Sequence, residues 1–185
     1  VSILGATMDD QRIVDAHQAA ARVAIKELEQ FAASRVRQDG KNEHRPTGNL
    51  VGAEFLHTSS RTLDPQLHTH FVLFNCTYDH VEQRWKALET FVMHEAIRYG
   101  TEVYRNELAK RLHALGYDTE RAAKGFEVKG VSPEIRERFS KRSTQIKAVV
   151  ANHETLGALV KSFGIPFHCV SHKDLDRAEH EKRMM

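Results

Sequence analysis

Residues 57–70, HTSSRTLDPQLHTH, decide how the chain folds, because they join two apolar runs through a polar loop. The run before the loop, residues 49–57, reads NLVGAEFLH, and the run after it, residues 68–76, reads HTHFVLFNC. Both are rich in apolar, β-branched and aromatic side chains and long enough to be strands. The polar residues between them can reverse the chain, so the two runs are predicted to pair antiparallel.

Three histidines fall where this pairing would bring them together. His68 and His70 are two residues apart in a strand and so project from one face, and the reversal would set His57 beside them. With 12 histidines in 185 residues, chance alone gives about 0.7 His-x-His pairs, so the pair by itself is weak support. Three imidazoles typically leave a fourth metal position open for water or substrate.

The pattern therefore predicts a divalent-metal site made of His57, His68 and His70. Zinc, manganese, magnesium or nickel are all candidate ions, since three imidazoles do not select one of them. The alternative is a hairpin whose histidines bind nothing.

Length and composition place the site in one ordinary intracellular domain, or in one domain with an appendage. Two distant cysteines give no disulfide framework and suit a reducing cytosol. No apolar run approaches the length of a membrane span, so a cytoplasmic protein with no membrane partner is predicted. A formal charge of +2 is too small to indicate nucleic-acid binding, so the distribution of charge has to carry that argument.

Basic residues cluster in SRVRQDGKNEHR, residues 34–45, where Asp39-Gly40 is a strong hairpin signal. The segment is predicted to form a two-stranded ribbon whose cations could hold DNA phosphates. A solvated surface hairpin is an equally good interpretation. The candidate DNA-binding residues of the ribbon are Arg35, Arg37, Lys41 and Arg45.

The polar loop supplies three more candidates. Arg61 follows His57 by four residues, and its guanidinium could contact a phosphate or a base edge. Asp64 and Gln66 share the loop and are also candidate DNA-binding residues. They could instead only shape the loop, with Pro65 stiffening it.

The remaining segments predict an α+β fold, in which helices cover one face of an antiparallel sheet that carries the metal site. His17, on the first helix, is expected at the surface or its boundary. The predicted elements are a strand-like opening VSILGAT, a helix from Asp9 or Asp10 to about residue 33, a return strand over 84–88, a helix over 89–115 closed by Gly116, a hairpin over 118–128 and a helix starting at Ser132-Pro133.

Several ordered segments resemble the conjugative relaxases of the TrwC and TraI type, which belong to the HUH endonucleases. The resemblance covers about residues 1–145. It is carried by HTSSR (57–61), DPQLHTH (64–70), TGNL (47–50), YRNEL (104–108) and LGY (115–117).

The resemblance implies an enzyme that nicks single-stranded DNA at an origin of transfer. In the family a tyrosine attacks the scissile phosphate, while a metal held by three histidines polarises it. Relaxosome and coupling proteins are the further partners implied. The nucleophilic tyrosines are expected ahead of Val1, so that this chain holds no catalytic nucleophile and does not nick alone. Its own tyrosines are expected to be structural, with Tyr78 the one uncertain case.

The last forty residues form a second predicted unit. Residues 146–185 read as a βαβ-like segment and resemble an internal part of formyltetrahydrofolate deformylases. The chain is therefore predicted to consist of a metal- and DNA-binding domain over 1–145 and an appendage over 146–185. The appendage is either a fragment of unrelated origin joined near residue 145, which we favour, or a relaxase segment that diverged by chance into this pattern. Two other functions stay open: a metal-dependent hydrolase that does not act on DNA, with Glu54 or Asp64 as its carboxylate, and a deformylase-related fragment that binds folate.

Overall fold

The computed structural model describes residues 1–38, 40–123, 125–141 and 144–145 of the chain. These residues fall into two compact units. The first comprises residues 1–59 and 65–131, and the second joins residues 60–64 to the chain from residue 132 onward. The strands and helix predicted within 146–185 lie outside the described residues.

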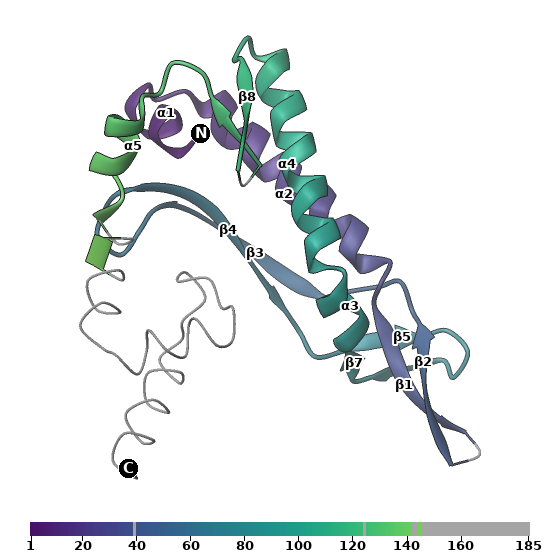
Figure 1. Cartoon of the computed structure of the whole chain (residues 1–185). Coiled ribbons are helices and arrows are strands. Elements are labelled where there is room, and N and C mark those ends of the chain that lie inside the picture. The colour runs from purple at the N-terminus through teal and green to yellow at the C-terminus, as the bar shows by residue number, and fades with distance from the viewer. Residues whose placement is uncertain (39, 124, 142–143, 146–185) are drawn as a thin grey trace, which may run out of the picture. The chain divides into compact units, whose positions relative to one another are not determined.

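Two long helices form the core of the first unit and lie side by side (Figure 1). Helix α2 (Gln11–Glu29) begins at Asp10, whose carboxylate accepts a hydrogen bond from the Arg12 backbone N–H, as the sequence predicts for an N-cap. Helix α4 (Ile97–Ala114) is followed by Gly116, which takes a positive φ of 88°. Between the helices lies a cluster of buried side chains: Ile13, Ala16, Ala20, Leu108, Leu112 and Val128.

Both predicted helices are too long in the sequence interpretation, because strand pairing claims their ends. The first helix stops at Glu29, since Ala33 already pairs with Pro46 and Glu89 in a sheet. The second is divided into α3 (Phe91–Glu95) and α4, and Leu88–Glu89 before it forms strand β7. Pairing between residues distant in sequence is invisible to local periodicity.

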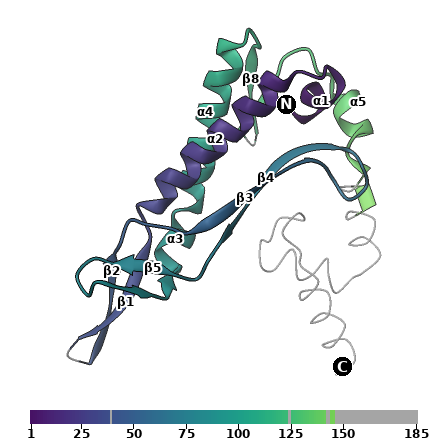
Figure 2. The same cartoon turned by 180° about the vertical axis from the view of Figure 1, so that it is seen from behind.

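The predicted basic ribbon is confirmed. Strand β1 (Ala33–Gln38) pairs antiparallel with β2 (Lys41–Pro46), and β7 pairs with the start of β1. Gly40 in the turn has a positive φ of 78°, whereas Asp39 lies outside the described residues. Figure 2 shows the ribbon reaching out beyond the end of α2.

The predicted central hairpin is also confirmed. Strand β3 (Gly52–Ser59) pairs antiparallel with β4 (Pro65–Leu73). The register shifts between His57 and Ser59, which marks a β-bulge at the end of β3. Helices α1 and α2 pack against β4 on one side, so an antiparallel pair with helices on one face gives the predicted α+β class.

The opening VSILGAT is a helix, α1 (Ser2–Thr7), and the prediction of a strand there is wrong. Val1 and Leu4 lie three residues apart, a spacing that puts both on one helical face, and both pack against the core cluster. Ser2 anchors the helix to the central hairpin, because its Oγ accepts a hydrogen bond from the Leu67 N–H. A short apolar run does not distinguish a strand from a helix by itself.

Short elements complete the two units. Strands β5 (Thr77–Asp79) and β6 (Arg84–Lys86) form one hairpin, and β8 (Thr119–Ala122) and β9 (Gly125–Val128) form the hairpin predicted for 118–128. In the second unit, α5 (Pro133–Arg138) begins at Ser132, whose hydroxyl accepts from the Ile135 N–H as predicted. None of the helices in the described ranges is long and apolar enough to cross a bilayer.

Candidate metal site and DNA-binding surface

The register of the central hairpin gathers the three predicted histidines on one face. His57 pairs directly with His68, and Phe55 pairs with His70, so all four side chains project from the same side. The intervening Leu56 and Thr69 are also a direct pair and project from the other side, towards the helices. The face that carries the histidines is therefore the one opposite the helical layer.

The three imidazole rings form a nearly equilateral triangle. Their centroids are 5.2 Å apart for His57 and His68, 5.1 Å for His57 and His70, and 5.0 Å for His68 and His70. Three imidazoles bound tetrahedrally at the usual Zn–N length would place ring centroids about 5 Å apart. The backbone thus sets the rings at the spacing that a shared ion requires.

The ring orientations are a separate matter from this spacing. Among the side chains that the structure describes, no group of three His, Cys, Asp or Glu residues is already arranged to hold a metal ion. The rings of His57 and His68 are stacked at 21°, while the His70 ring stands nearly perpendicular to both. Rotation of the side-chain torsions, without backbone movement, is what would turn the nitrogens towards a common point.

One of the three rings already has its tautomer chosen. His68 Nδ1 lies 2.8 Å from the carbonyl oxygen of Gln66, an acceptor only, so Nδ1 carries the proton and donates it. The Nε2 atom is then left with its lone pair free to bind a cation. A metal-ligating histidine commonly has such a carbonyl behind it.

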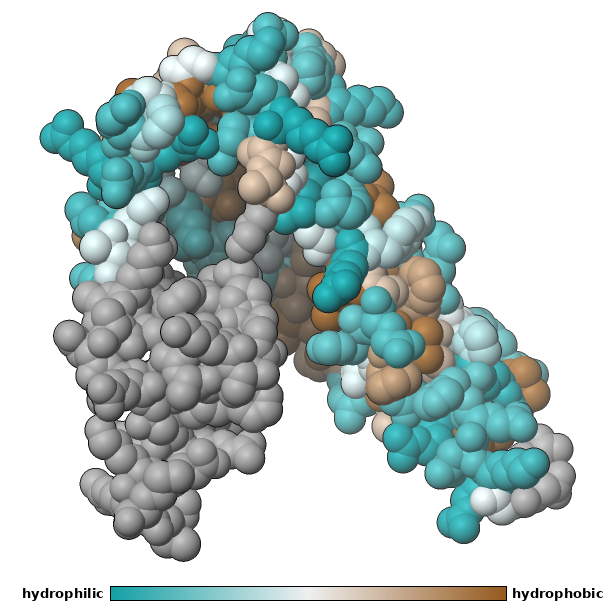
Figure 3. Space-filling model, in the orientation of Figure 1, coloured by the Kyte–Doolittle hydropathy of each residue, from teal (hydrophilic) through white to brown (hydrophobic). Residues whose placement is uncertain are grey.

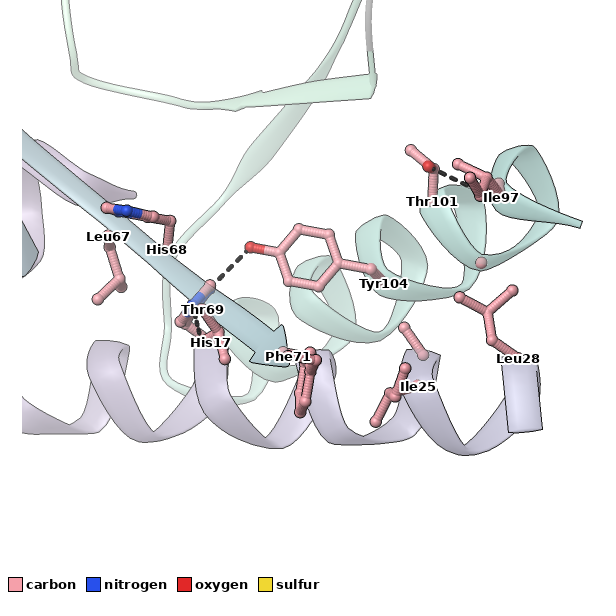
Figure 4. Close-up of a pocket in the computed structure, with 13 residues that line it drawn as sticks. His17, Ile25, Leu28, Leu67, His68, Thr69, Phe71, Ile97, Thr101 and Tyr104 are labelled. Atoms are coloured by element: carbon pink, nitrogen blue, oxygen red, sulfur yellow. Dashed lines mark hydrogen bonds between the residues drawn. The ribbon is translucent and has the colours of Figure 1, made fainter. Parts of the chain in front are cut away.

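Behind the hairpin, a buried group of hydrogen-bonded polar side chains supports strand β4 (Figure 4). His17 on α2 is only 4% exposed, and its ring pairs through Nδ1 with the Tyr104 hydroxyl at 2.8 Å and through Nε2 with Thr69 Oγ1 at 2.9 Å. The expectation that His17 lies at the surface is therefore wrong, because its spacing on α2 turns it towards β4. Thr69, between His68 and His70, is thus tied to both long helices.

Burial sets the acid–base properties of this group. It lowers the pKa of His17, with a further lowering from nearby His68 and an opposing effect of Glu54. It also raises the pKa of the Tyr104 hydroxyl to about 12. Both groups therefore stay neutral at physiological pH. The same residues line one end of a cavity of about 460 Å³ between α2, α4 and β4.

The ribbon cations divide into paired and free groups. Arg35 binds Glu89 at 2.7 Å, and Arg45 binds the buried Asp79 at 2.9 Å. Arg37 and Lys41 are exposed, and within the described part of the chain no ion pair engages either of them. Two of the four predicted DNA-binding cations are thus unpaired.

The polar loop belongs to the second unit and places its residues differently. Arg61 is exposed, whereas Asp64 is 3% exposed and its carboxylate accepts hydrogen bonds from the Thr62 hydroxyl and the Lys141 backbone N–H. Asp64 therefore shapes its own unit, which was one of the two roles that the sequence allowed. Gln66, on β4, is exposed and its carbonyl orients His68.

Glu54, one of the two carboxylates considered for a metal hydrolase, is not on the histidine face. Glu54 pairs with Phe71 and alternates with His57 across the strand, so it projects towards the helices, where it binds Arg22 at 2.7 Å. Glu54 therefore points away from the face where a metal-bound water at the histidines would lie.

Three of the four tyrosine hydroxyls are committed elsewhere. Tyr104 pairs with His17, Tyr99 donates to Glu27 and Tyr117 donates to Asp10. The carboxylates raise the pKa of Tyr99 and Tyr117, and burial raises the pKa of Tyr104. A raised pKa opposes ionisation of the hydroxyl to a nucleophile. Tyr78, on β5, pairs across the hairpin with Trp85.

Known proteins share both this sequence and this fold. Residues 1–167 match the model of the TrwC relaxase family. Multifunctional conjugation protein TraI of Escherichia coli is 39% identical over an alignment of 168 residues, which covers 84% of this chain and 9% of TraI. The metal-bound structure of the conjugative relaxase TrwC in complex with oriT DNA superposes with a TM-score of 0.78 at 33% identity, covering 96% of this chain and 58% of the TrwC chain.

A shorter similarity is of a different kind. Formyltetrahydrofolate deformylase of Haemophilus influenzae is 44% identical over 48 residues, which are 26% of this chain and 17% of the enzyme. That partial match agrees with the resemblance seen in the sequence. The match to the relaxase model covers most of the chain, although the chain spans only about a tenth of the length of TraI. The chain belongs to the TrwC relaxase family.

Proposed function

We propose that this chain is the metal- and DNA-binding part of a conjugative relaxase that acts on single-stranded DNA at an origin of transfer. The observation that carries the proposal is the triangle of His57, His68 and His70 on the open face of the central hairpin, in a chain of the TrwC family. TrwC itself is described as complexed with oriT DNA in metal-bound and copper-bound forms.

In this proposal the three histidines would hold one divalent ion, which when bound polarises a DNA phosphate and stabilises charge at the reacting centre. Three imidazole ligands with an open fourth position do not select one ion, so zinc, manganese, magnesium, nickel and copper all remain candidates. The residues of the chain contribute rigidity. The Gln66 carbonyl orients His68, and the hydrogen bond with His17 holds Thr69, which lies between His68 and His70.

DNA would be held by cations on two elements. Arg37 and Lys41 on the ribbon are free to bind phosphates. Exposed Arg61, four residues after His57 in the sequence, is a further candidate for a phosphate contact. Arg35 and Arg45 would contribute to the positive field while keeping their carboxylate partners, and exposed Gln66 could hydrogen-bond to a base. Asp64 stays a weaker candidate because it is buried.

Strand cleavage also needs a nucleophile, and we propose that none of the four tyrosines in this chain supplies it. The pKa of three of them is raised, by a hydrogen bond to a carboxylate in Tyr99 and Tyr117 and by burial in Tyr104. A tyrosine elsewhere in the parent protein would perform the attack. We further propose that the parent works in the cytoplasm, together with relaxosome and coupling proteins.

Metal binding is tested by comparing His68→Ala with His94→Ala. His94 is an exposed histidine on α3, outside the triangle, and so controls for nonspecific loss of imidazole. Isothermal titration with Mn²⁺ and Zn²⁺ should show one site in the wild type and in His94→Ala, and none in His68→Ala. Equal affinity in all three proteins would contradict the assignment of the ligands.

DNA binding is tested separately by fluorescence anisotropy with a labelled single-stranded oligonucleotide that contains an origin of transfer. Arg37→Gln and Lys41→Gln should each weaken binding and lower the slope of log Kd against log salt by about 0.7. Glu43→Gln, a neighbouring exposed residue of the ribbon, should not lower that slope. If the oligonucleotide does not bind, the DNA-binding function is refuted.

The proposal that Tyr78 is not the nucleophile is tested by covalent adduct formation between the protein and the same oligonucleotide. Tyr78→Phe should form as much adduct as the wild type.

A further inference from the structure

The β5–β6 hairpin carries an aromatic pair, half-buried Tyr78 and exposed Trp85, that the proposed function leaves unused. Trp85, the single tryptophan of the chain, is 58% exposed. Its cross-strand partner is Tyr78, and the two rings meet edge to face with centroids 5.4 Å apart and an angle of 70°. Exposed His80 extends the group, with its ring 5.1 Å from that of Tyr78.

We propose that Trp85 and Tyr78 form a stacking platform for an unpaired base of the DNA, an inference that rests on the proposed DNA-binding function. Tryptophan and tyrosine combine a large apolar ring with a polar group and are enriched at binding interfaces. Aromatic side chains bind unpaired bases through their faces with little sequence preference.

Strand alternation explains why these rings point outward. Thr77 and Asp79, the neighbours of Tyr78 on β5, are both fully buried against the ribbon. Successive strand residues project to opposite faces, so Tyr78 faces away from the ribbon, and its direct partner Trp85 faces the same way. The platform is therefore the outer face of the hairpin.

The platform is fixed rigidly to the basic ribbon. The Asp79 carboxylate accepts hydrogen bonds from Ser34 Oγ on β1 at 3.0 Å and from Arg45 on β2 at 2.9 Å. It also accepts from the backbone N–H groups of Val81 and Glu82, which closes the turn between β5 and β6. The aromatic pair therefore has a fixed position relative to the cations of the ribbon.

Charge favours DNA over a protein partner with an apolar face. Arg45, Arg84 and Lys86 surround two carboxylates, Asp79 and Glu82, which leaves one positive charge in excess. On the adjoining ribbon, unpaired Arg37 and Lys41 add two positive charges and exposed Glu43 removes one. On the face seen in Figure 3, the end of the first unit that carries the ribbon is mostly hydrophilic, with some hydrophobic residues among the hydrophilic ones.

The single tryptophan is its own reporter. The wild type is titrated with oligothymidylate and with an abasic strand of equal length, which offers the same phosphates without bases. Indole fluorescence should fall with oligothymidylate and stay unchanged with the abasic strand, while anisotropy of a labelled strand shows that both bind. A fully paired duplex should quench less than the single strand, because its bases are already stacked.

Substitution separates stacking from charge. Trp85→Ala should weaken oligothymidylate binding by about 5-fold to 100-fold, with the slope against salt unchanged, and Trp85→Phe should restore most of the affinity. Tyr99→Ala, which removes a comparably exposed aromatic from α4, should bind as the wild type does. Circular dichroism checks that each variant is folded.

The two proposals can fail independently. If oligothymidylate binds but leaves the indole fluorescence unchanged, or if Trp85→Ala binds as tightly as the wild type, the platform is refuted while DNA binding stands. If the abasic strand quenches as strongly as oligothymidylate, the ring senses phosphate or a conformational change and the platform is again refuted. If no strand binds even at low salt, both proposals fail.

Discussion

Replacing His17 with alanine should destabilise the first unit by removing the partner of two hydroxyl groups. Its ring lies between the Tyr104 hydroxyl at 2.8 Å and Thr69 Oγ1 at 2.9 Å, and is 4% exposed. An average hydrogen bond contributes about 1 kcal/mol net, and each buried polar group left without a partner costs about 1–3 kcal/mol. We expect the free energy of unfolding to fall by about 2–4 kcal/mol near neutral pH.

This loss should depend on pH, and its direction follows from the lowered pKa of His17. A group whose pKa is lower in the folded protein binds its proton first in the unfolded chain. The stabilisation is therefore complete above the unfolded pKa, about 6.5. Below that pH it declines by up to about 1.4 kcal/mol per pH unit until the pKa of the folded protein is reached. The stability difference between wild type and His17→Ala should shrink accordingly in acid.

Urea denaturation followed by circular dichroism measures this difference, with a chelator present so that metal binding does not contribute. Measurements on both proteins at several pH values between about 5 and 8 cover the window below the unfolded pKa. Tyr104→Phe is the matched control, because it removes one hydrogen bond but keeps the imidazole. Its stability should fall by about 1 kcal/mol or more, with the pH dependence of the wild type retained. A difference between wild type and His17→Ala that is constant, or that grows in acid, would refute the reasoning.

Three further changes test the packing and the ribbon. Leu112→Ala empties a fully buried position of the core and should lower the free energy of unfolding by about 3–5 kcal/mol, seen as a lower urea midpoint at unchanged m value. Gly100→Ala would place a Cβ atom 2.9 Å from Leu28 Cδ1 and Cγ, where α2 and α4 approach closely. The overpacking should outweigh the gain in helix propensity, for a net loss of about 1 kcal/mol that thermal unfolding would detect. Asp79→Asn should speed amide hydrogen exchange at Val81 and Glu82, whose N–H groups lose a carboxylate. Burial alone would raise the pKa of Asp79, but hydrogen bonds from Glu82, Ser34 and Val81 outweigh burial and hold that pKa below its ordinary value of 3.8. The stabilisation by the Asp79 carboxylate is therefore complete above that pH and is lost in acid. This pH dependence should be missing from Asp79→Asn.

The sequence predicted best what depends on local periodicity. The hairpin over 49–76, the ribbon, the N-cap at Asp10 and the stop at Gly116 each follow from residues close together in the chain, and each is confirmed. The face shared by His57, His68 and His70 follows from the same alternation. Their role as metal ligands stays a prediction.

What the sequence missed depends on partners far away in the chain. Arg45 looked like a free DNA-binding cation, but its partner Asp79 is 34 residues distant and reaches it only through the folding of β5 against the ribbon. His17 looked like a surface residue, and its partners Thr69 and Tyr104 are 52 and 87 residues away. The α1 helix was misread because seven apolar or small residues satisfy both periodicities. The one signal in the sequence that could have indicated the role of His17 was its position beside the buried stripe of α2.

The alternation of the central hairpin has a consequence for which insertions and deletions the protein can tolerate. Residues of β4 serve the helical layer and the histidine face in strict turn, with Thr69 on one side and its two neighbours on the other. One residue inserted between Leu67 and His68 would shift the C-terminal part of the strand by one position, so that the imidazoles of His68 and His70 face the core and Thr69 faces solvent. Two inserted residues would restore the faces but move both rings away from His57. Length variation among relatives with a working site should therefore be confined to the loop and absent from this strand, because a change there that abolishes the site also exposes part of the core.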